Sequence, residues 1–342
     1  MAKTFDTDLA IIIVSYNVDK YLIKCLMSLK EFVVDQPFKL VVVDNNSTDK
    51  SAFIAKDESP DCTLIVNEKN IGFGRAVNLA ASTVYAKHYL ILNPDTEVIN
   101  DIINKMMVHL RGHKSAGLVG CRMLNTDGTI QPHSCSPPGL TIIASNLLNL
   151  KYLLKNRYLH HLLSLFRWTA PVRDYLDCGN YFGAWKKVQA VPGSCFLVEG
   201  ELFHKIGGFD ESIFLYYEDA DLFYRIINHE KREIHLLPDT GVIHHCGKSF
   251  STSFTEISPY KYWSLLYYVR KNSSILNHGI VIFLLLFTTI IKFSVKWICC
   301  IKKLNHNVKY LNDCVDTIKI CILGLKSFDP FRVTPSSTKN AK

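Results

Sequence analysis

The residues best suited to chemistry in this 342-residue chain are three carboxylates that fall within four positions. Glu218, Asp219 and Asp221 are flanked by aromatic residues on both sides, and the stretch 191–198 that precedes them is predicted to be a strand. Carboxylates this close raise one another's pKa, which favours a general base. If a helix begins here, Glu218 and Asp219 stand in its first turn, where the helix dipole stabilises anions, so capping is the alternative interpretation. Asp221 and Arg225 are four residues apart, which suits an ion pair along that helix.

A second set of polar residues follows four apolar segments near the start of the chain. The segments are 9–14, 39–43, 63–66 and 89–92, and helical spacing is found over 20–32, 47–55 and 74–84. This alternation predicts an α/β domain with a doubly wound sheet. Ligands of such sheets bind at the carboxyl ends of the strands, so the residues that follow each strand are predicted to line one pocket. They are Ser15, Tyr16 and Asn17, then Asp44 and Asn46, then residues 67–74, and finally Asn93 and Asp95.

The acidic members of this set have distinct uses. The Asp44 carboxylate could accept hydrogen bonds from a nucleobase or a ribose, or it could cap the following helix. Asp95 follows Asn93-Pro94 and is a candidate ligand for Mg²⁺ or Mn²⁺, since these cations bind through one or two carboxylates plus substrate phosphates. A turn aspartate is the alternative. Two adjacent histidines, His244 and His245, follow another apolar segment and offer a further metal ligand.

The stretch 70–75 resembles half of a G-x-G-x-x-G fingerprint. Val77 stands where the third glycine would be, and the stretch does not follow the first strand. Both facts exclude a dinucleotide-binding Rossmann domain. We expect instead a loop through which backbone N–H groups and Arg75 approach a diphosphate.

Composition excludes several classes of protein. Apolar residues make up 48% of the chain and charged residues 20%, which is unlike a disordered protein. The net charge is +8, but residues 260–342 hold 13 Lys/Arg against 3 Asp/Glu, so the first 259 residues are slightly acidic. A uniformly basic nucleic-acid binder would not show this pattern. The 11 cysteines include no C-x-x-C pair, which excludes a zinc ribbon and suits a reducing cytosol.

The basic C-terminal part also carries the strongest apolar run, residues 279–291, which Lys292 and Lys296 interrupt. It is shorter than the roughly 20 residues of a spanning helix. We therefore predict a helix that lies on the membrane and binds anionic lipid through its lysines, with a spanning or a buried helix as alternatives. Residues 308–325 have the spacing of an amphipathic helix. The run 9–14 is too short for a signal peptide, so no export is expected.

Together these segments resemble the inverting family 2 glycosyltransferases of the GT-A fold, and most of all the rhamnosyltransferase branch that builds bacterial surface polysaccharides such as O-antigen and capsule. Segments 11–17, 41–49, 67–78, 90–98, 193–225 and 242–249 carry the resemblance. It implies a GT-A-type doubly wound nucleotide-binding sheet in a catalytic domain over 1–255, with 136–190 as a variable insertion on the acceptor side. The basic, apolar helical tail 256–342 would associate with the membrane.

The resemblance also implies roles for single residues. Asp219 would be the general base, with Glu218 as the other member of the family's Glu-Asp pair. Asn93-Pro94-Asp95 stands where the family has Asp-x-Asp, so Asp95 would bind Mg²⁺ or Mn²⁺ together with His244, and His245 is the second choice. The residues implied to bind the nucleotide-sugar are Ser15, Tyr16, Asn17, Asp44, Asn46, Gly72, Arg75, Asn78, Asn93 and Asp95.

The implied reaction is the attack of an acceptor hydroxyl, on a saccharide or a lipid-linked saccharide, on the anomeric carbon of a nucleotide-sugar. dTDP-rhamnose is the favoured donor, and UDP-galactofuranose, a UDP-hexose or a UDP-N-acetylhexosamine are the alternatives. The expected location is the cytoplasmic face of the inner membrane, with no nucleic-acid partner. Outside this reaction, a nucleotidyltransferase would need a glycine-rich loop that residues 15–24 lack. A non-catalytic membrane scaffold for polysaccharide assembly is the other alternative.

Overall fold

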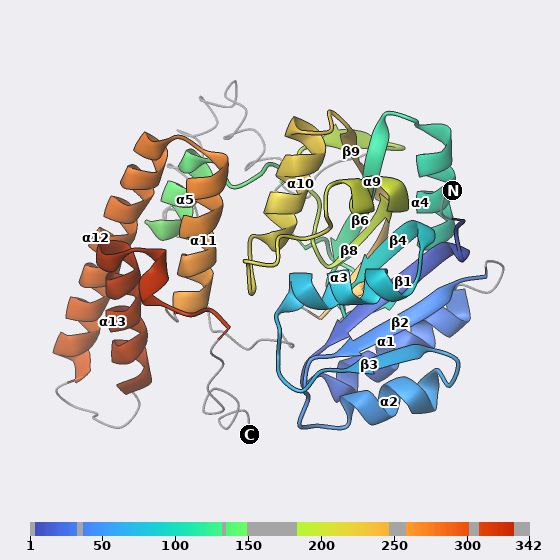
Figure 1. The fold of residues 1–342 in the computed structure, drawn as a ribbon, viewed down its shortest axis with the longest axis horizontal. Coiled ribbons are helices and arrows are strands. Elements are labelled where there is room, and N and C mark those ends of the chain that lie inside the picture. Colours follow the sequence, from blue (N-terminus) through green and yellow to red (C-terminus); the bar gives the residue numbers. More distant parts are fainter. Residues whose placement is uncertain are drawn as a thin grey trace. The chain divides into compact units, whose positions relative to one another are not determined.

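A computed structural model describes residues 4–32, 37–131, 135–148, 183–245, 258–300 and 308–331 of the chain. These residues form two compact units (Figure 1). The first contains the described residues up to 137 together with 183–210 and 219–245, and the second contains 138–148, 211–218 and those from 258 onward. Most of the insertion predicted at 136–190 lies outside the described residues.

The first unit is built on a nine-stranded mixed sheet. Its N-terminal half is parallel, in the order β3-β2-β1-β4, and it explains the apolar segments of the sequence. Leu9 to Val14 are all buried in β1, because strands covered on both faces need continuous apolar runs. The four strands are β1 (Thr7–Ser15), β2 (Lys39–Asp44), β3 (Thr63–Val66) and β4 (Ala86–Leu92).

The other half of the sheet is mixed, which the sequence did not indicate. β8 (Cys195–Glu199) pairs antiparallel with both β4 and β6 (Ala116–Leu124). Beyond β6 lie β9 (Glu233–His244), β5 (Thr96–Val98) and β7 (Lys186–Val188). Because β8 runs against β4, the beginning of β8 meets the carboxyl end of β4. Strand order therefore brings the residues that precede β8 to the predicted pocket.

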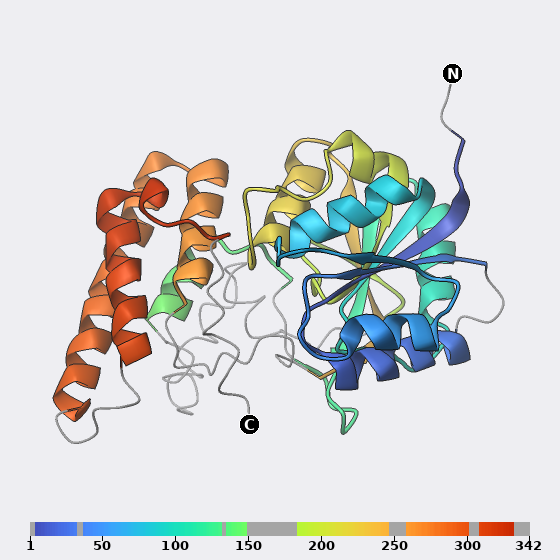
Figure 2. The same cartoon turned by 60° about the horizontal axis from the view of Figure 1, so that its bottom comes forward.

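Helices cover both faces of this sheet (Figure 2). Along β1, alternate side chains face opposite layers: Ile12 packs toward one and Ile11 toward the other. One layer consists of α3 (Phe73–Thr83), α9 (Gly200–Lys205) and α10 (Glu218–Asn228), and the other of α1 (Asp19–Phe32), α2 (Ser51–Glu58) and α4 (Ile102–Gly112).

Two predicted boundaries were wrong. The helix expected over 47–55 begins only at Ser51, because residues 44–49 form a hydrogen-bonded loop in which the Ser47 N–H donates to Asp44 Oδ1 over 2.8 Å. The strand expected over 191–198 begins at Cys195, and the residues before it form a turn. In both places turn-forming residues delay the start of the helix or strand, although apolar residues stand beside them.

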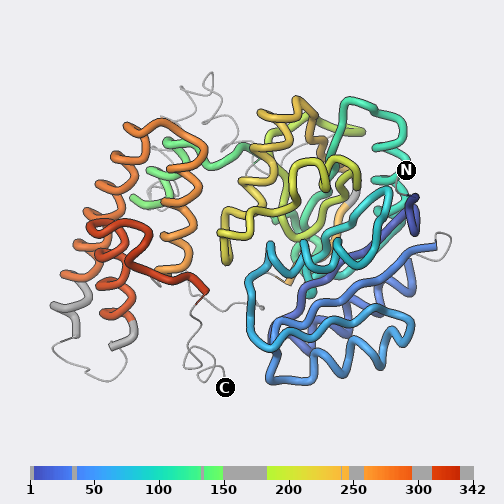
Figure 3. The backbone as a smooth tube through the Cα atoms, viewed as in Figure 1, coloured from blue at the N-terminus to red at the C-terminus, as the bar shows by residue number. Residues whose placement is uncertain are grey.

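The second unit is mainly helical, and Figure 3 traces its C-terminal helices in orange and red and the helix over 140–147 in green. It contains α5 (Leu140–Leu147), α11 (Pro259–Asn272), α12 (Ile275–Cys300), α13 (Val308–Leu323) and a short 3-10 helix, Leu325–Ser327. Trp263 is buried here, and its indole N–H donates to Leu325 O over 2.9 Å. Within the described ranges, one stretch, Ile275–Ser294 in α12, has the length and the mean hydropathy, 2.0, to cross a membrane.

Candidate functional site

Ser15 and Asp44 are paired neighbours at the carboxyl ends of β1 and β2. Both are buried. Asp44 Oδ1 accepts the Ser47 N–H, whereas Asp44 Oδ2 and Ser15 Oγ have no hydrogen-bond partner. Because buried polar atoms are normally paired, two unpaired oxygens side by side suit a ligand that carries N–H or O–H groups. One oxygen of Asp44 thus holds the loop after β2, whereas the helix that Asp44 could have capped begins only at Ser51, after Lys50 and without a side-chain cap, so the contact of Asp44 with a nucleoside stays a prediction.

The loops after β1 and β2 are joined to each other by Asn17. Its Oδ1 accepts the Thr48 N–H over 2.7 Å, and its own N–H donates to Ser47 Oγ over 3.0 Å. Asn17 and Asn46 both adopt positive φ, of 54° and 67°, which asparagine tolerates better than most residues. Tyr16 lies beside them and is half-buried. Three of the predicted nucleotide-binding residues therefore share one rigid rim.

Asn45 was not among the predicted site residues, but it connects this rim to the glycine-containing stretch. It is buried, its Nδ2 donates to Gly72 O over 3.2 Å, and its Oδ1 accepts from Asn67 over 2.8 Å. Gly72 precedes α3 with a φ of 89°, and Arg75 lies in the first turn of that helix. The expected phosphate loop is thus a helix N-terminus, where backbone N–H groups favour anions.

Asn78 is committed to another contact. Its Nδ2 donates to Phe209 O and its Oδ1 accepts the Phe209 N–H, each over 2.9 Å. The same loop packs closely on α3, since a Cβ on Gly74 would lie 2.9 Å from that of Phe209. The structure therefore shows Asn78 holding a loop of the protein, and its role in donor binding stays a prediction.

Asp95 and His244 come together where β5 pairs with β9. Asp95 is 2% exposed, its Oδ1 has no hydrogen-bond partner, and His244 Nε2 lies 3.5 Å from that oxygen. The same nitrogen lies 3.2 Å from Ser194 Oγ. Ser194 in turn accepts the Asn93 N–H through its carbonyl over 2.8 Å, so Asn93 connects β4 to the turn before β8.

The neighbouring His245 is held differently. Its Nε2 is 2.5 Å from Glu97 Oε1, and its ring lies against that of Tyr21. Burial opposes the charge on Glu97, but the hydrogen bonds from His245 and Lys24 outweigh it and lower the pKa of that carboxyl. The backbone N–H of His245 donates to Asp95 O over 2.9 Å, but its imidazole contacts Glu97, so His244 supplies the imidazole next to the Asp95 carboxylate.

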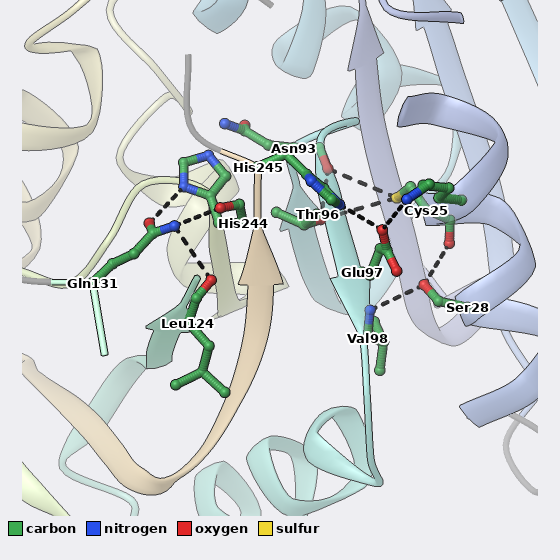
Figure 4. Close-up of polar contacts among 11 residues, drawn as sticks. Cys25, Ser28, Asn93, Thr96, Glu97, Val98, Leu124, Gln131, His244 and His245 are labelled. Atoms are coloured by element: carbon green, nitrogen blue, oxygen red, sulfur yellow. Dashed lines mark hydrogen bonds and ion pairs between the residues drawn. The ribbon is translucent and has the colours of Figure 1, made fainter. Parts of the chain in front are cut away.

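Gln131, which sequence reasoning missed, holds the other side of His244 (Figure 4). Its Oε1 is 3.1 Å from His244 Nδ1, and its Nε2 donates to the carbonyls of His244 and Leu124 over 2.5 and 3.3 Å. Gln131 and His244 are 113 positions apart, and no pattern around Gln131 marks it as a partner.

The three clustered carboxylates have different surroundings in the structure. Asp221 is fully buried and its Oδ2 accepts from Arg225 Nε over 2.7 Å, so these two residues form the predicted ion pair. Glu218 is buried as the first residue of α10. Asp219 follows it, half-buried, and its Oδ1 accepts the Ala220 N–H over 2.7 Å. Burial raises the pKa of Asp219, which suits a group that must take up a proton.

Gly193 brings Asp219 to the rest of the site. A Cβ on Gly193 would lie 2.5 Å from Asp219 Oδ2, so the backbone there is in close contact with the carboxylate. The next residue, Ser194, contacts His244 and Asn93. One turn before β8 therefore connects the candidate base to the Asp95–His244 pair.

The residues present fit a divalent cation. Asp95 Oδ1 is a buried, unpaired carboxylate oxygen beside an imidazole nitrogen, and both are ligands of Mn²⁺ and related ions. In the described part of the chain no group of three His, Cys, Asp or Glu side chains gathers around one point. Asp95 and His244 would hold the ion, and substrate phosphate oxygens would complete its coordination.

Comparison with known proteins identifies the family and the fold. The model of "Glycosyl transferase family 2" matches residues 10–169. The chain is 26% identical over 257 residues to the N-acetylglucosaminyl-diphospho-decaprenol L-rhamnosyltransferase of Mycobacterium tuberculosis, which covers 70% of this chain and 77% of that protein. It is 30% identical over 120 residues to Protein RfbJ of Shigella flexneri, which covers 35% and 89% of the two.

Among solved structures, the mannosyltransferase PcManGT from Pyrobaculum calidifontis, in complex with GDP-Man and Mn²⁺, superposes with a TM-score of 0.52 and 13% identity. The match covers 96% of this chain and 92% of that one. This likeness shows the predicted GT-A fold. The chain belongs to glycosyltransferase family 2, and it is a glycosyltransferase of glycan biosynthesis.

Proposed function

We propose that this protein transfers a sugar from a nucleotide-sugar to a hydroxyl of a lipid-linked saccharide, with inversion at the anomeric carbon. The observation that carries the proposal is the turn before β8. Gly193 contacts the carboxylate of Asp219, and Ser194 contacts His244 beside Asp95. A candidate base therefore lies next to a candidate diphosphate site, as direct displacement requires.

Each residue then has a task. Ser15 Oγ and Asp44 Oδ2 bind the nucleoside through its N–H and hydroxyl groups, and Tyr16, Asn17 and Asn46 form the rim. Gly72 and Arg75 at the start of α3 bind the diphosphate. Asp95 and His244 would hold Mg²⁺ or Mn²⁺, and the bound ion would supply positive charge against the leaving diphosphate.

The base is Asp219, supported by the hydrogen bond from Ala220 and by the neighbouring Glu218. Its carboxylate takes the proton from the acceptor hydroxyl as that oxygen attacks the anomeric carbon. The raised pKa of Asp219 favours this step because a carboxylate of ordinary acidity would hold the proton weakly. Arg75 places a positive charge at the phosphate end of the same site.

We propose dTDP-rhamnose as the donor and a polyprenyl-diphosphate saccharide as the acceptor. The support is the 26% identity to a rhamnosyltransferase that is named for an acceptor of this kind. UDP-galactofuranose, a UDP-hexose or a UDP-N-acetylhexosamine are the alternative donors. The product would belong to a surface polysaccharide of the O-antigen or capsule type.

The second unit would keep the enzyme at its lipid-linked acceptor. Six apolar side chains of α12 are between 45% and 91% exposed: Ile275, Leu276, Phe283, Phe287, Ile290 and Ile291. Phe287 follows Phe283 by four positions, and Ile290 and Ile291 follow Phe287 by three and four, so these four side chains lie on one face of the helix. We propose that residues 256–342 hold the catalytic domain, 1–255, peripherally on the cytoplasmic face of the membrane, with the excess of Lys and Arg facing anionic lipid.

Calorimetry of donor binding tests this proposal. Full-length protein in detergent would be titrated with dTDP-rhamnose and with UDP- and GDP-sugars, with and without Mn²⁺. We expect Mn²⁺-dependent binding of dTDP-rhamnose that Asp95→Ala abolishes and that Asp221→Asn, on the buried ion pair, leaves in place if that variant folds. Binding of one of the UDP-sugars alone would keep the reaction and replace the donor. No binding by folded wild-type protein would refute the proposed site.

A further inference from the structure

The strongest feature that the proposed function leaves unused is the amide of Gln131 against the imidazole of His244. An amide can present its oxygen or its nitrogen, and the choice decides which ring nitrogen of His244 carries the proton. Here the surroundings settle the orientation. Gln131 Nε2 lies 2.5 Å from His244 O and 3.3 Å from Leu124 O, and a carbonyl can only accept a hydrogen bond. The amide nitrogen therefore faces the carbonyls, and Oε1 faces the ring.

The orientation of the amide fixes the proton on the imidazole. Gln131 Oε1 has no hydrogen to donate, and it lies 3.1 Å from His244 Nδ1. Nδ1 must therefore carry the proton and donate it. In a neutral imidazole Nε2 then keeps its lone pair. This is the nitrogen that lies 3.5 Å from Asp95 Oδ1 and 3.2 Å from Ser194 Oγ, whose hydroxyl can donate to it.

The consequence is an arrangement of two electron-rich atoms that face each other. Asp95 Oδ1 has no hydrogen-bond donor, and a neutral Nε2 without a proton supplies none. Such a pair is unfavourable by itself and becomes favourable when a cation lies against both atoms. His245 shows the opposite case in the same segment, since its Nε2 is engaged by Glu97 and is not available to a ligand.

We propose that Gln131 is a positioning residue that holds His244 in its Nδ1–H form and so prepares Nε2 and Asp95 to bind a divalent cation. This inference rests on the proposed function for the identity of the ligand, but which ring nitrogen of His244 faces Gln131 Oε1 is a property of the protein alone. The alternative role for Gln131 is structural, because its two carbonyl contacts also join the ends of β6 and β9.

Two substitutions separate these roles. Gln131→Met removes every hydrogen bond of the side chain and keeps its size nearly the same. Gln131→Glu keeps an oxygen that accepts from Nδ1–H but loses the donor to Leu124 and His244. If Gln131 acts by orienting the His244 imidazole, the Gln131→Met variant should bind Mn²⁺ about 10–100-fold more weakly than wild type, the usual cost of losing such a supporting partner. The Gln131→Glu variant should then bind Mn²⁺ almost as tightly as wild type. If Gln131 acts as a structural tie, both variants should weaken binding equally and lower the melting temperature together.

The deciding measurement is ¹⁵N NMR of the histidine side chains in metal-free protein, with His244→Gln to assign the signal. We expect wild-type His244 as the Nδ1–H tautomer, a mixture in Gln131→Met, and the Nδ1–H form again in Gln131→Glu. Isothermal titration with Mn²⁺ and donor supplies the affinities. An Nε2–H tautomer in wild type, or unchanged affinity in Gln131→Met, would overturn the inference. An Nδ1–H tautomer in a protein that binds no Mn²⁺ would instead refute the proposed function and leave the positioning intact.

Discussion

Replacing Gly193 by alanine should slow transfer without preventing donor binding. An added Cβ would lie 2.5 Å from Asp219 Oδ2 and 3.2 Å from its Cγ, whereas ordinary contact begins at 3.4 Å. The carboxylate must therefore retreat by about 0.9 Å, or the turn must move by as much. The φ of Gly193 is not positive, so alanine adds bulk there without backbone strain.

The size of the effect follows from the sensitivity of a displacement reaction to geometry. A misplacement of about 1 Å costs up to about 10²-fold in rate, so we expect kcat to fall by about 10–100-fold, or about 1.4–2.7 kcal/mol in the activation barrier. The dissociation constant of the donor should change little, because Ser15 and Asp44, which form the proposed nucleoside site, lie at the ends of β1 and β2 and not in the turn that contains Gly193.

The assay is release of nucleoside diphosphate by full-length protein in detergent, with a short-chain polyprenyl-diphosphate saccharide as acceptor and donor affinity measured separately by calorimetry. Gly112→Ala is the matched control, since a Cβ at that helical position meets nothing within 4 Å. Thermal melting of both variants separates a local shift from loss of the fold. Wild-type kcat in a folded Gly193→Ala protein would show that the position of Asp219 does not limit the reaction.

Three further perturbations test other parts of the structure. Asp219→Asn should lower kcat by about 10²–10⁴-fold and keep donor affinity, as measured by the same two assays, and wild-type turnover would remove Asp219 as the base. His109 Nε2 lies 2.8 Å from His235 Nδ1, and burial first, then the neighbouring histidines, lower the pKa of His109 to about 4. In the unfolded chain this histidine takes up its proton near pH 6.5. As the pH is lowered from 6.5 to 4, the free energy of unfolding should therefore fall, by at most about 3 kcal/mol. In the His109→Gln variant the melting temperature should change less with pH across that range. A pH dependence as steep as that of wild type would contradict the role given to His109. The double variant Phe283→Ser/Phe287→Ser should float less with anionic vesicles than wild type. The control Phe53→Ser, at a phenylalanine in the first unit that is as exposed as Phe283, should float like wild type. Equal flotation of wild type and both variants would exclude α12 as the membrane contact.

Much of the N-terminal half of the fold could be predicted because its signals are local. A strand buried on both faces needs an unbroken apolar run, and residues 9–14 and 39–43 are such runs. The polar residues that follow them lie at one edge simply because the strands are parallel. Asp44 and Asp95 could be chosen for this reason, before any contact was known.

The boundaries that failed were those where two local signals compete. Residues 47–50 contain good helix-starting residues, yet Asp44 and Asp49 accept backbone N–H groups from Ser47 and Ser51 and hold the chain in a loop. Such side-chain hydrogen bonds compete with helix formation, and their geometry depends on where β2 ends.

The sequence alone therefore determined which residue types follow the strands, where the charge lies and which stretch forms the apolar helix, because each of these depends on neighbours along the chain. Only the tertiary structure decided the direction of β8, which brings Gly193 to Asp219 and Ser194 to His244. It also decided that Gln131 lies against the His244 ring. Contacts between residues tens of positions apart depend on strand order, and strand order is settled by packing of the whole sheet, which no local pattern encodes.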